Sequence, residues 1–228
     1  MSGTTRREPR SWRWALTGLL LVALLGGGAW TVLASPLLAV NRVVVDGARV
    51  VPARQVLAAA DVPVGGPLSR VDTAAVAARV ERIPRIADAL VVRRWPGTLA
   101  VVVVERSALA GVRTGKGYAL MDGEAVVFDR VAKLPAGVPV VKASGLDPRR
   151  SLRAVLKALD SLPPALRARV GTATATTVDD VTLSLDGDKR VVWGSADRGA
   201  RKAVVLRALL RQEADVYDVS APDAPTTR

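Results

Sequence analysis

Few residues in this chain have the types and spacing that catalysis needs. The 228-residue sequence contains no cysteine and no histidine, so thiolate chemistry, cysteine-based zinc sites and the commonest general base are unavailable to it. The segment Thr114–Gly117 resembles a phosphate-binding loop only faintly, because Ala110 stands where the first glycine belongs and Gly117 where Ser or Thr belongs. No Ser-x-x-Lys pair lies on a recognisable element. We predict that the chain is not an enzyme and binds no cofactor.

Two pairs of acidic residues are the remaining candidate metal ligands. Asp179-Asp180 and Asp186/Asp188 place oxygen donors close together in sequence, and calcium binds oxygen donors. The segment Asp186-Gly187-Asp188, however, lacks the further carboxylates of an EF-hand loop and falls where a hairpin turn is expected. We therefore expect turn-forming roles for these acids and no metal site.

An uncharged stretch near the N-terminus is the first element that must position the rest of the chain. No charged residue lies between Trp14 and Leu33, and about 20 apolar residues in a helix span the roughly 30 Å hydrocarbon core of a bilayer. We predict a single transmembrane helix at residues 14–34. A cleaved signal peptide is the alternative, but its apolar region usually runs about 7–15 residues and is shorter than this stretch.

Basic and aromatic residues beside this stretch predict its orientation. Four arginines and one glutamate precede Trp14, so the positive-inside rule places residues 1–13 in the cytoplasm as a short tail and all later residues outside. Tryptophans near both ends of the helix fit the aromatic belts of a bilayer. The expected membrane-interface anchors are Arg10, Trp12, Arg13, Trp14 and Trp30.

The chain is strongly basic, with a formal net charge of +12. A charge of this size often indicates nucleic-acid binding, but the predicted topology places most of it on the side of the membrane where no chromosome is found. Anionic lipid headgroups or cell-wall polymers are the partners available to this charge, and a coding bias toward arginine is a second explanation. We expect no nucleic-acid partner.

Residues 42–106 are predicted to form a compact unit after an exit segment at residues 35–41. Apolar residues at helical spacing predict one helix after Pro52 and another after Asp72, a good N-cap. With the strands, the order is strand, helix, helix, strand, strand, which predicts two helices on one face of a three-stranded sheet. The last strand is almost continuously apolar and is therefore expected to be central. The three predicted strands are Arg42–Val45, Ile86–Arg94 and Leu99–Val104.

Residues 107–220 are predicted to form a second α+β domain with a mostly antiparallel sheet. Hairpins are expected at Asp122-Gly123 and at Asp186-Gly187. The segment Leu134–Lys142 contains two prolines and is expected to be an edge or a loop rather than a central strand. A final strand is predicted after the last helix, and residues 221–228 are predicted to be a disordered tail.

The predicted domain order resembles that of a known family. Residues 42–106 resemble a polypeptide-transport-associated (POTRA) domain in the motifs VVVDGARVV, VGGPLSRVD and RRWPGTLAVVVVER. A POTRA domain directly after one N-terminal membrane helix resembles the FtsQ/DivIB bacterial cell-division family. The later segments that agree with this family are LMDGEAVVFDR at Leu120–Arg130, VVWG at Val191–Gly194 and YDVS at Tyr217–Ser220.

The resemblance implies a non-catalytic scaffold of the division septum in the cell membrane. In this family the POTRA domain contributes septal localisation and contacts to upstream division proteins. The β-domain binds the small coiled-coil membrane proteins FtsB and FtsL through the strand after the last helix, which a partner strand extends. The physical basis is that a terminal strand is an open edge that another chain can complete. The residues in that place are Val216, Tyr217, Asp218, Val219 and Ser220.

Three alternatives remain open from the residues alone. Val216–Ser220 can be a plain closing strand with Tyr217 packed on the core. A POTRA-bearing chaperone or secretion factor would bind extended polypeptides at the same edge. A basic binder of cell-wall polymers would show affinity that falls steeply with salt.

Overall fold

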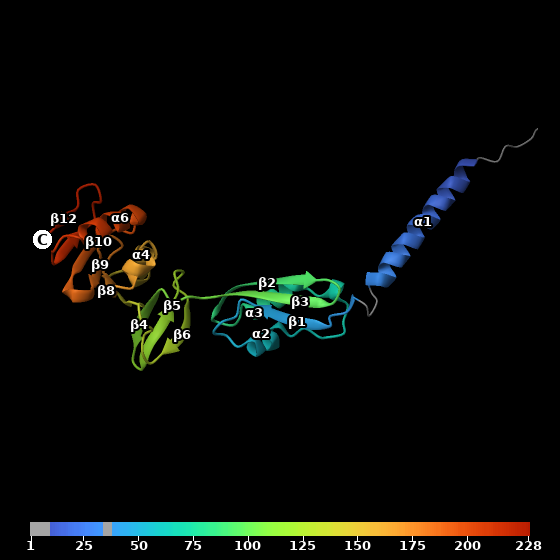
Figure 1. Cartoon of the computed structure of the whole chain (residues 1–228), viewed down its shortest axis with the longest axis horizontal. Coiled ribbons are helices and arrows are strands. Elements are labelled where there is room, and N and C mark those ends of the chain that lie inside the picture. Colours follow the sequence, from blue (N-terminus) through green and yellow to red (C-terminus); the bar gives the residue numbers. More distant parts are fainter. Residues whose placement is uncertain (1–9, 34–37) are drawn as a thin grey trace, which may run out of the picture. The chain divides into compact units, whose positions relative to one another are not determined.

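The chain folds into two compact units after an N-terminal helix, as seen in a computed structural model (Figure 1). The structure describes residues 10–33 and 38–228. The chain divides between Glu105 and Arg106. Both units combine helices with sheets, so the predicted α+β class is confirmed.

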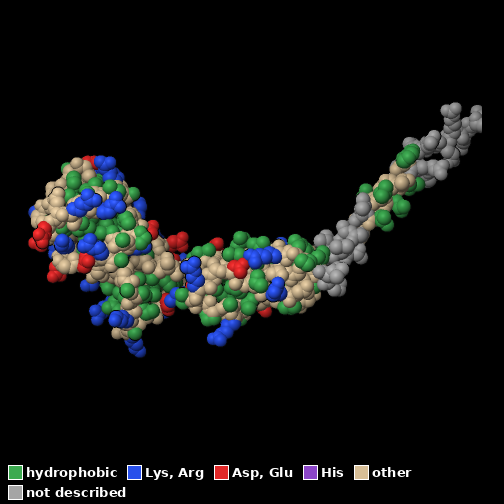
Figure 2. Space-filling view, in the orientation of Figure 1, with side chains coloured by type: hydrophobic (Ala, Val, Ile, Leu, Met, Phe, Trp, Pro, Cys, Tyr) green, Lys and Arg blue, Asp and Glu red, His purple; other side chains and the backbone are tan. Residues whose placement is uncertain are grey.

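Helix α1 spans Arg10–Leu33, and exposed hydrophobic side chains lie along its described part (Figure 2). Among the described residues, no helix is both long enough and apolar enough to cross a membrane. Of the predicted interface anchors, only the side chain of Trp14 is described, and it is 71% exposed. The side chains of Arg10, Trp12, Arg13 and Trp30 lie outside the description, as do residues 1–9 of the predicted tail and residues 34–37 at the predicted exit segment.

The first unit has the predicted order of strand, helix, helix, strand, strand. Its sheet order is β1-β3-β2, so the apolar third strand is central, as predicted. β1 runs parallel to β3, whereas β2 is antiparallel to it. The elements are β1 (Arg42–Asp46), α2 (Ala53–Ala60), the 3-10 turn η2 (Leu68–Arg70), α3 (Thr73–Val80), β2 (Ile86–Arg94) and β3 (Thr98–Glu105).

The core of the first unit lies between its helices and one face of β3. Leu99 and Val101 of β3 are buried with Val56 of α2 and Val76 of α3. Asp72 caps α3 by accepting a hydrogen bond from the Ala75 amide at 3.0 Å, which satisfies one of the free amides of the first turn.

The start of the first unit corrects one predicted boundary. Ala39 and Val40, expected in an exit segment, belong to the folded unit: Ala39 forms a bridge with Pro67, and Val40 is fully buried. The Val40 amide donates to the Gly66 carbonyl at 2.8 Å. The apolar type of these residues was visible in the sequence, but their pairing with a loop about 25 residues later required the tertiary fold.

The second unit is built on one nine-stranded sheet with the order β12-β11-β10-β9-β8-β7-β4-β5-β6. Five of its eight strand pairings are antiparallel, which confirms the mostly antiparallel prediction. The elements are β4 (Ala110–Thr114), β5 (Gly117–Met121), β6 (Val127–Val131), β7 (Val140–Ala143), α4 (Pro148–Asp160), α5 (Pro164–Arg167), β8 (Val170–Ala175), β9 (Val181–Leu185), the 3-10 turn η3 (Asp186–Asp188), β10 (Arg190–Gly194), α6 (Gly199–Leu209), β11 (Val216–Asp218) and β12 (Thr226–Thr227).

The centre of this sheet corrects the prediction for Leu134–Lys142. The end of that segment forms β7, which lies between β4 and β8 and is parallel to both. β7 begins at Val140, directly after Pro139, so both prolines precede the strand and neither removes a donor from it. The prolines therefore mark the entry to an interior strand rather than an edge.

Candidate partner-binding edge

The end of the nine-stranded sheet is built by a strand–helix–strand crossover. β10 and β11 are parallel, with Val191 opposite Tyr217 and Val192 opposite Asp218, and α6 makes the connection that parallel neighbours require. The Val219 amide donates to the Val192 carbonyl at 3.0 Å and so continues the pairing. The crossover places the predicted partner-binding residues beside β10 at this end of the sheet.

Lys202 fastens α6 to the end of β10. It is only 1% exposed, and its Nζ donates to the carbonyl oxygens of Trp193 at 2.9 Å and Ser195 at 2.8 Å. Burial lowers the pKa of Lys202 and the nearby Arg198 lowers it further, while neighbouring carboxylates partly oppose this. Sequence reasoning did not predict this buried charge, although its position one turn before the buried Leu206 was a usable signal.

The side chains of the predicted partner-binding residues divide between the core and the surface. Tyr217 and Val219 are fully buried, and the Tyr217 hydroxyl donates to the Gln212 carbonyl at 2.8 Å. Val216 and Asp218 are partly exposed, and Ser220 is exposed. Charged substitutions at Tyr217 or Val219 would therefore report on folding rather than on partner contact.

Ser220 lies unusually close to the end of β10. Its Cβ would be 2.8 Å from a Cβ added at Gly194, whose φ of 70° is in the left-handed region. Only glycine meets both conditions without strain. The Asp218 carboxylate accepts hydrogen bonds from the Ser220 amide at 2.9 Å and hydroxyl at 2.7 Å. These contacts hold Ser220 against the end of β10.

The outer edge of β11 is paired with another strand of the same chain. This corrects two predictions, an open edge at Val216–Ser220 and a disordered tail at residues 221–228. Thr226–Thr227 forms β12, which pairs antiparallel with β11 so that Tyr217 lies opposite Thr227 and Asp218 opposite Thr226. The amides of Val216 and Arg228 each donate to the other residue's carbonyl at 2.9 Å. A two-residue strand gives almost no sequence periodicity, so only the tertiary structure could reveal it.

Asp223 ties the loop before β12 to α6. Its carboxylate accepts a hydrogen bond from Arg198 at 2.6 Å and forms an ion pair with Arg201. The hydrogen bond from Arg198, followed by that from Arg201, lowers the pKa of Asp223 below its ordinary value. Pro222 beside it is buried. The loop is thereby held against the helix, and with it β12.

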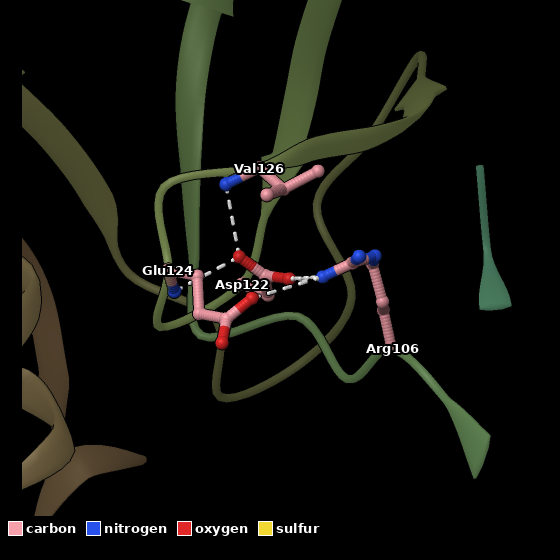
Figure 3. A network of polar contacts seen from close by, with 4 residues as sticks. All are labelled: Arg106, Asp122, Glu124 and Val126. Atoms are coloured by element: carbon pink, nitrogen blue, oxygen red, sulfur yellow. Dashed lines mark hydrogen bonds and ion pairs between the residues drawn. The ribbon is translucent and has the colours of Figure 1, made fainter. Parts of the chain in front are cut away.

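A second polar network lies at the start of the second unit (Figure 3). Arg106 forms an ion pair with Asp122 and a longer one, at 3.5 Å, with Glu124. Asp122 also accepts hydrogen bonds from the backbone amides of Glu124 at 3.0 Å and Val126 at 2.9 Å. The predicted Asp122-Gly123 turn therefore joins β5 to β6 and holds the entering chain.

The acids considered as metal ligands have the predicted turn roles. Asp180 accepts hydrogen bonds from the amides of Thr176 at 2.9 Å and Thr177 at 2.8 Å. Burial alone would raise the pKa of Asp180, but these bonds and one from the Thr176 hydroxyl lower it. Asp186–Asp188 forms the turn between β9 and β10. Within residues 10–33 and 38–228 there is no group of three or more acids placed to hold a metal ion.

The two units and the edge they carry define a POTRA-type protein with a β-rich second domain. Residues 38–106 match the family description "POTRA domain, FtsQ-type", and residues 110–221 match "Cell division protein FtsQ/DivIB, C-terminal". The chain belongs to the FtsQ/DivIB family of cell-division proteins. These matches confirm the resemblance drawn from the sequence motifs.

Relatives of this chain are similar to it in sequence over nearly its whole length. The chain is 40% identical to "Cell division protein FtsQ" of Mycobacteroides abscessus over 92% of its own length and 68% of that protein. It is 35% identical to the FtsQ of Streptomyces coelicolor over 97% of its length and 89% of that protein. The extracytoplasmic domain of DivIB from Geobacillus stearothermophilus aligns over 48% of the chain and 98% of that domain, at 17% identity and a TM-score of 0.35.

Proposed function

We propose that this protein is a non-catalytic scaffold of the division septum that binds FtsB- and FtsL-like membrane proteins at the β11–β12 end of its second unit. Membership of the FtsQ/DivIB family supports a role in division. The observation that carries the proposal is that, among the described residues, β12 is the last strand of the sheet and has a neighbour on one side only. Such an edge invites a strand from another chain.

Thr227 provides the backbone groups for this contact. Val216 and Arg228 exchange both of their N–H···O bonds, so in an antiparallel pair the residue before Arg228 directs its N–H and C=O away from β11. The partly or fully exposed side chains of Val216, Asp218 and Ser220 lie on the adjoining strand and complete the proposed surface. Tyr217 and Val219 support that surface from the core side.

The N-terminal helix is the proposed membrane anchor. The proposal rests on the sequence, in which no charged residue lies between Trp14 and Leu33, and about 20 apolar residues in a helix span the hydrocarbon core of a bilayer. Its arginines precede the apolar stretch, which supports a cytoplasmic N-terminus and an extracytoplasmic pair of units. The anchor places the scaffold beside partners that are themselves membrane proteins, and the first unit is proposed to contact upstream division proteins.

Capture of the partners by the full chain tests this function. The chain and an FtsB–FtsL pair are reconstituted in lipid nanodiscs, and binding is measured for Thr227→Pro and Thr227→Val. Proline removes the outward N–H of Thr227, whereas valine keeps it and suits a strand. We expect at least about tenfold weaker capture for Thr227→Pro and unchanged capture for Thr227→Val.

Other outcomes would reject the proposal. Equal capture by both variants would exclude this edge, and absence of capture by the unsubstituted chain would exclude the partners. Loss of capture in raised salt, together with binding of wall polymer, would favour the polymer binder instead. Competition by unfolded client peptides would favour the chaperone. A fluorescent fusion should form mid-cell bands in dividing cells.

A further inference from the structure

Strands β4 and β7 separate from one another inside the nine-stranded sheet. Their parallel pairing covers only Gly111 opposite Val140 and Val112 opposite Val141. Beyond this point, among the described residues, Arg113 pairs only with Tyr118 of β5, and Lys142 pairs only with Thr174 of β8. Each strand therefore has one edge without a strand neighbour where they part, at a place remote in the strand order from β11 and β12.

A groove of about 400 Å³ lies at this parting. Apolar side chains from both strands and from the start of α4 form its floor, with Val141 buried and Val112 and Leu152 partly buried. This volume is within the range of ordinary ligand pockets, about 300–1,000 Å³. The groove is therefore large enough to accept apolar side chains of a short segment.

Three cations line this groove. They are the exposed side chains of Arg113, Lys142 and Arg149. None of the three has a carboxylate partner among the residues that the structure describes, whereas Arg150 beside them is paired with Asp147 at 3.3 Å. Unpaired charges of one sign around an apolar floor attract a ligand of opposite charge.

We propose that this groove binds an acidic, extended segment of a partner protein, in which carboxylates alternate with apolar residues. In an extended chain, alternate side chains point to opposite sides, so the apolar residues fill the floor while the carboxylates meet Arg113, Lys142 and Arg149. The backbone of such a segment pairs with the free edge of β4 or β7. A polyphosphate chain would satisfy the cations but neither the apolar floor nor the strand edges. The site goes beyond the proposed function, because it shares no residue with the β11–β12 edge.

A defined peptide tests the groove. The probe is a capped peptide of about eight alternating glutamate and valine residues, added to the full chain in nanodiscs and followed by titration calorimetry and by amide chemical shifts. We expect its affinity to fall about tenfold in the triple variant Arg113→Gln/Lys142→Gln/Arg149→Gln, since exposed ion pairs each contribute a modest factor. The largest shifts should fall on Val112, Lys142 and Ala143.

A matched triple variant controls for overall charge. Arg150→Gln/Arg153→Gln/Lys157→Gln removes the same charge from α4 outside the groove lining, and it should bind the probe as the unsubstituted chain does. An equal loss of peptide affinity in both triple variants would overturn the proposal. Failure of the peptide to bind the unsubstituted chain would also overturn it. Equal binding of a lysine–valine peptide or of glycerol-phosphate polymer would also overturn it. Thr227→Pro should leave peptide binding unchanged, which separates this site from partner capture.

Discussion

Glu105 and Arg106 are consecutive residues whose side chains are bonded within different units. The Glu105 carboxylate accepts hydrogen bonds from the backbone amides of Arg49, Val50 and Val51 at 2.8–3.1 Å. Arg106 instead pairs with Asp122 of the second unit. Each of these two side chains therefore bonds within its own unit and fixes the end of the chain there.

Replacing Glu105 by glutamine should destabilise the first unit by about 1 kcal/mol, because a charged acceptor of three backbone amides becomes neutral. Burial alone would raise the pKa of Glu105, but those amides and Arg85 lower it below 4.5. The stabilisation is therefore present above pH 4.5 and is lost as the pH falls through the lowered pKa. Chemical denaturation of both proteins should show a difference that vanishes in acid; a difference independent of pH would contradict this.

Replacing Asp122 by alanine should cost about 2–3 kcal/mol of unfolding free energy. The change leaves the Arg106 guanidinium, 16% exposed, without its main carboxylate and removes the acceptor of two backbone amides. The control is Glu124→Ala, whose side chain is 79% exposed and whose loss should cost less than about 1 kcal/mol. Denaturant titration measures both, and equal costs would show that the network in Figure 3 does not stabilise the hairpin.

Replacing Lys202 by alanine should cost about 2–3 kcal/mol of unfolding free energy, since the buried Trp193 carbonyl and the partly buried Ser195 carbonyl lose their donor and the removed side chain leaves a cavity. A second measurement uses the pKa of Lys202, which burial lowers from 10.5. The unfolded chain binds the proton more tightly, so stability should rise with pH between the lowered pKa and 10.5. Lys202→Met removes this titration, and the stability of the unsubstituted chain relative to it should increase in that window. If the difference in unfolding free energy between the two proteins did not change with pH in this window, the result would contradict the burial of the Lys202 charge.

Tyr217→Phe should cost about 1 kcal/mol, the value of one hydroxyl hydrogen bond to the Gln212 carbonyl. Tyr217→Asp should unfold the second unit, because it places a carboxylate at a fully buried position. Near-ultraviolet circular dichroism distinguishes the two results. A folded Tyr217→Asp protein would show that this side chain faces a partner rather than the core.

Asp223→Asn should free the loop before β12. The variant loses its charge-assisted bond with Arg198 and its ion pair with Arg201, so amide exchange at Val216 and Arg228 should accelerate. In the unsubstituted chain the bonds to Arg198 and Arg201 lower the pKa of Asp223, so the attachment is present above the ordinary carboxyl pKa and is lost as the pH falls through the lowered value. Unchanged exchange in the variant would show that β12 is held by its strand pairing alone.

Periodicity and turn residues predicted most of the fold. In the first unit, the helical stripe through Val76 and Val80 and the apolar run from Leu99 correctly predicted a helix and a central strand. Both patterns arise because one face or both faces of an element must be buried. The entry through Val40 and the interior strand Val140–Ala143 were mispredicted, because their partners are far away in sequence.

The candidate edge shows the same limit. The motif Tyr217–Ser220 correctly indicated a strand after the last helix, which the structure places at Val216–Asp218, yet it could not show that Tyr217 is buried or that Thr227 lies opposite it. Strand pairing with two residues leaves no periodic signal. The groove beside Arg113 was equally hidden, since it exists only where β4 and β7 part.

The sequence by itself determined the family, the two-unit α+β architecture and the absence of cysteine and histidine chemistry, because these depend on residue types and local spacing. The tertiary structure decided which side chains of Val216–Ser220 face the core, which strand ends the sheet, and where unpaired cations gather. Those properties depend on contacts between residues far apart in the chain, and such contacts form only when the whole core is packed.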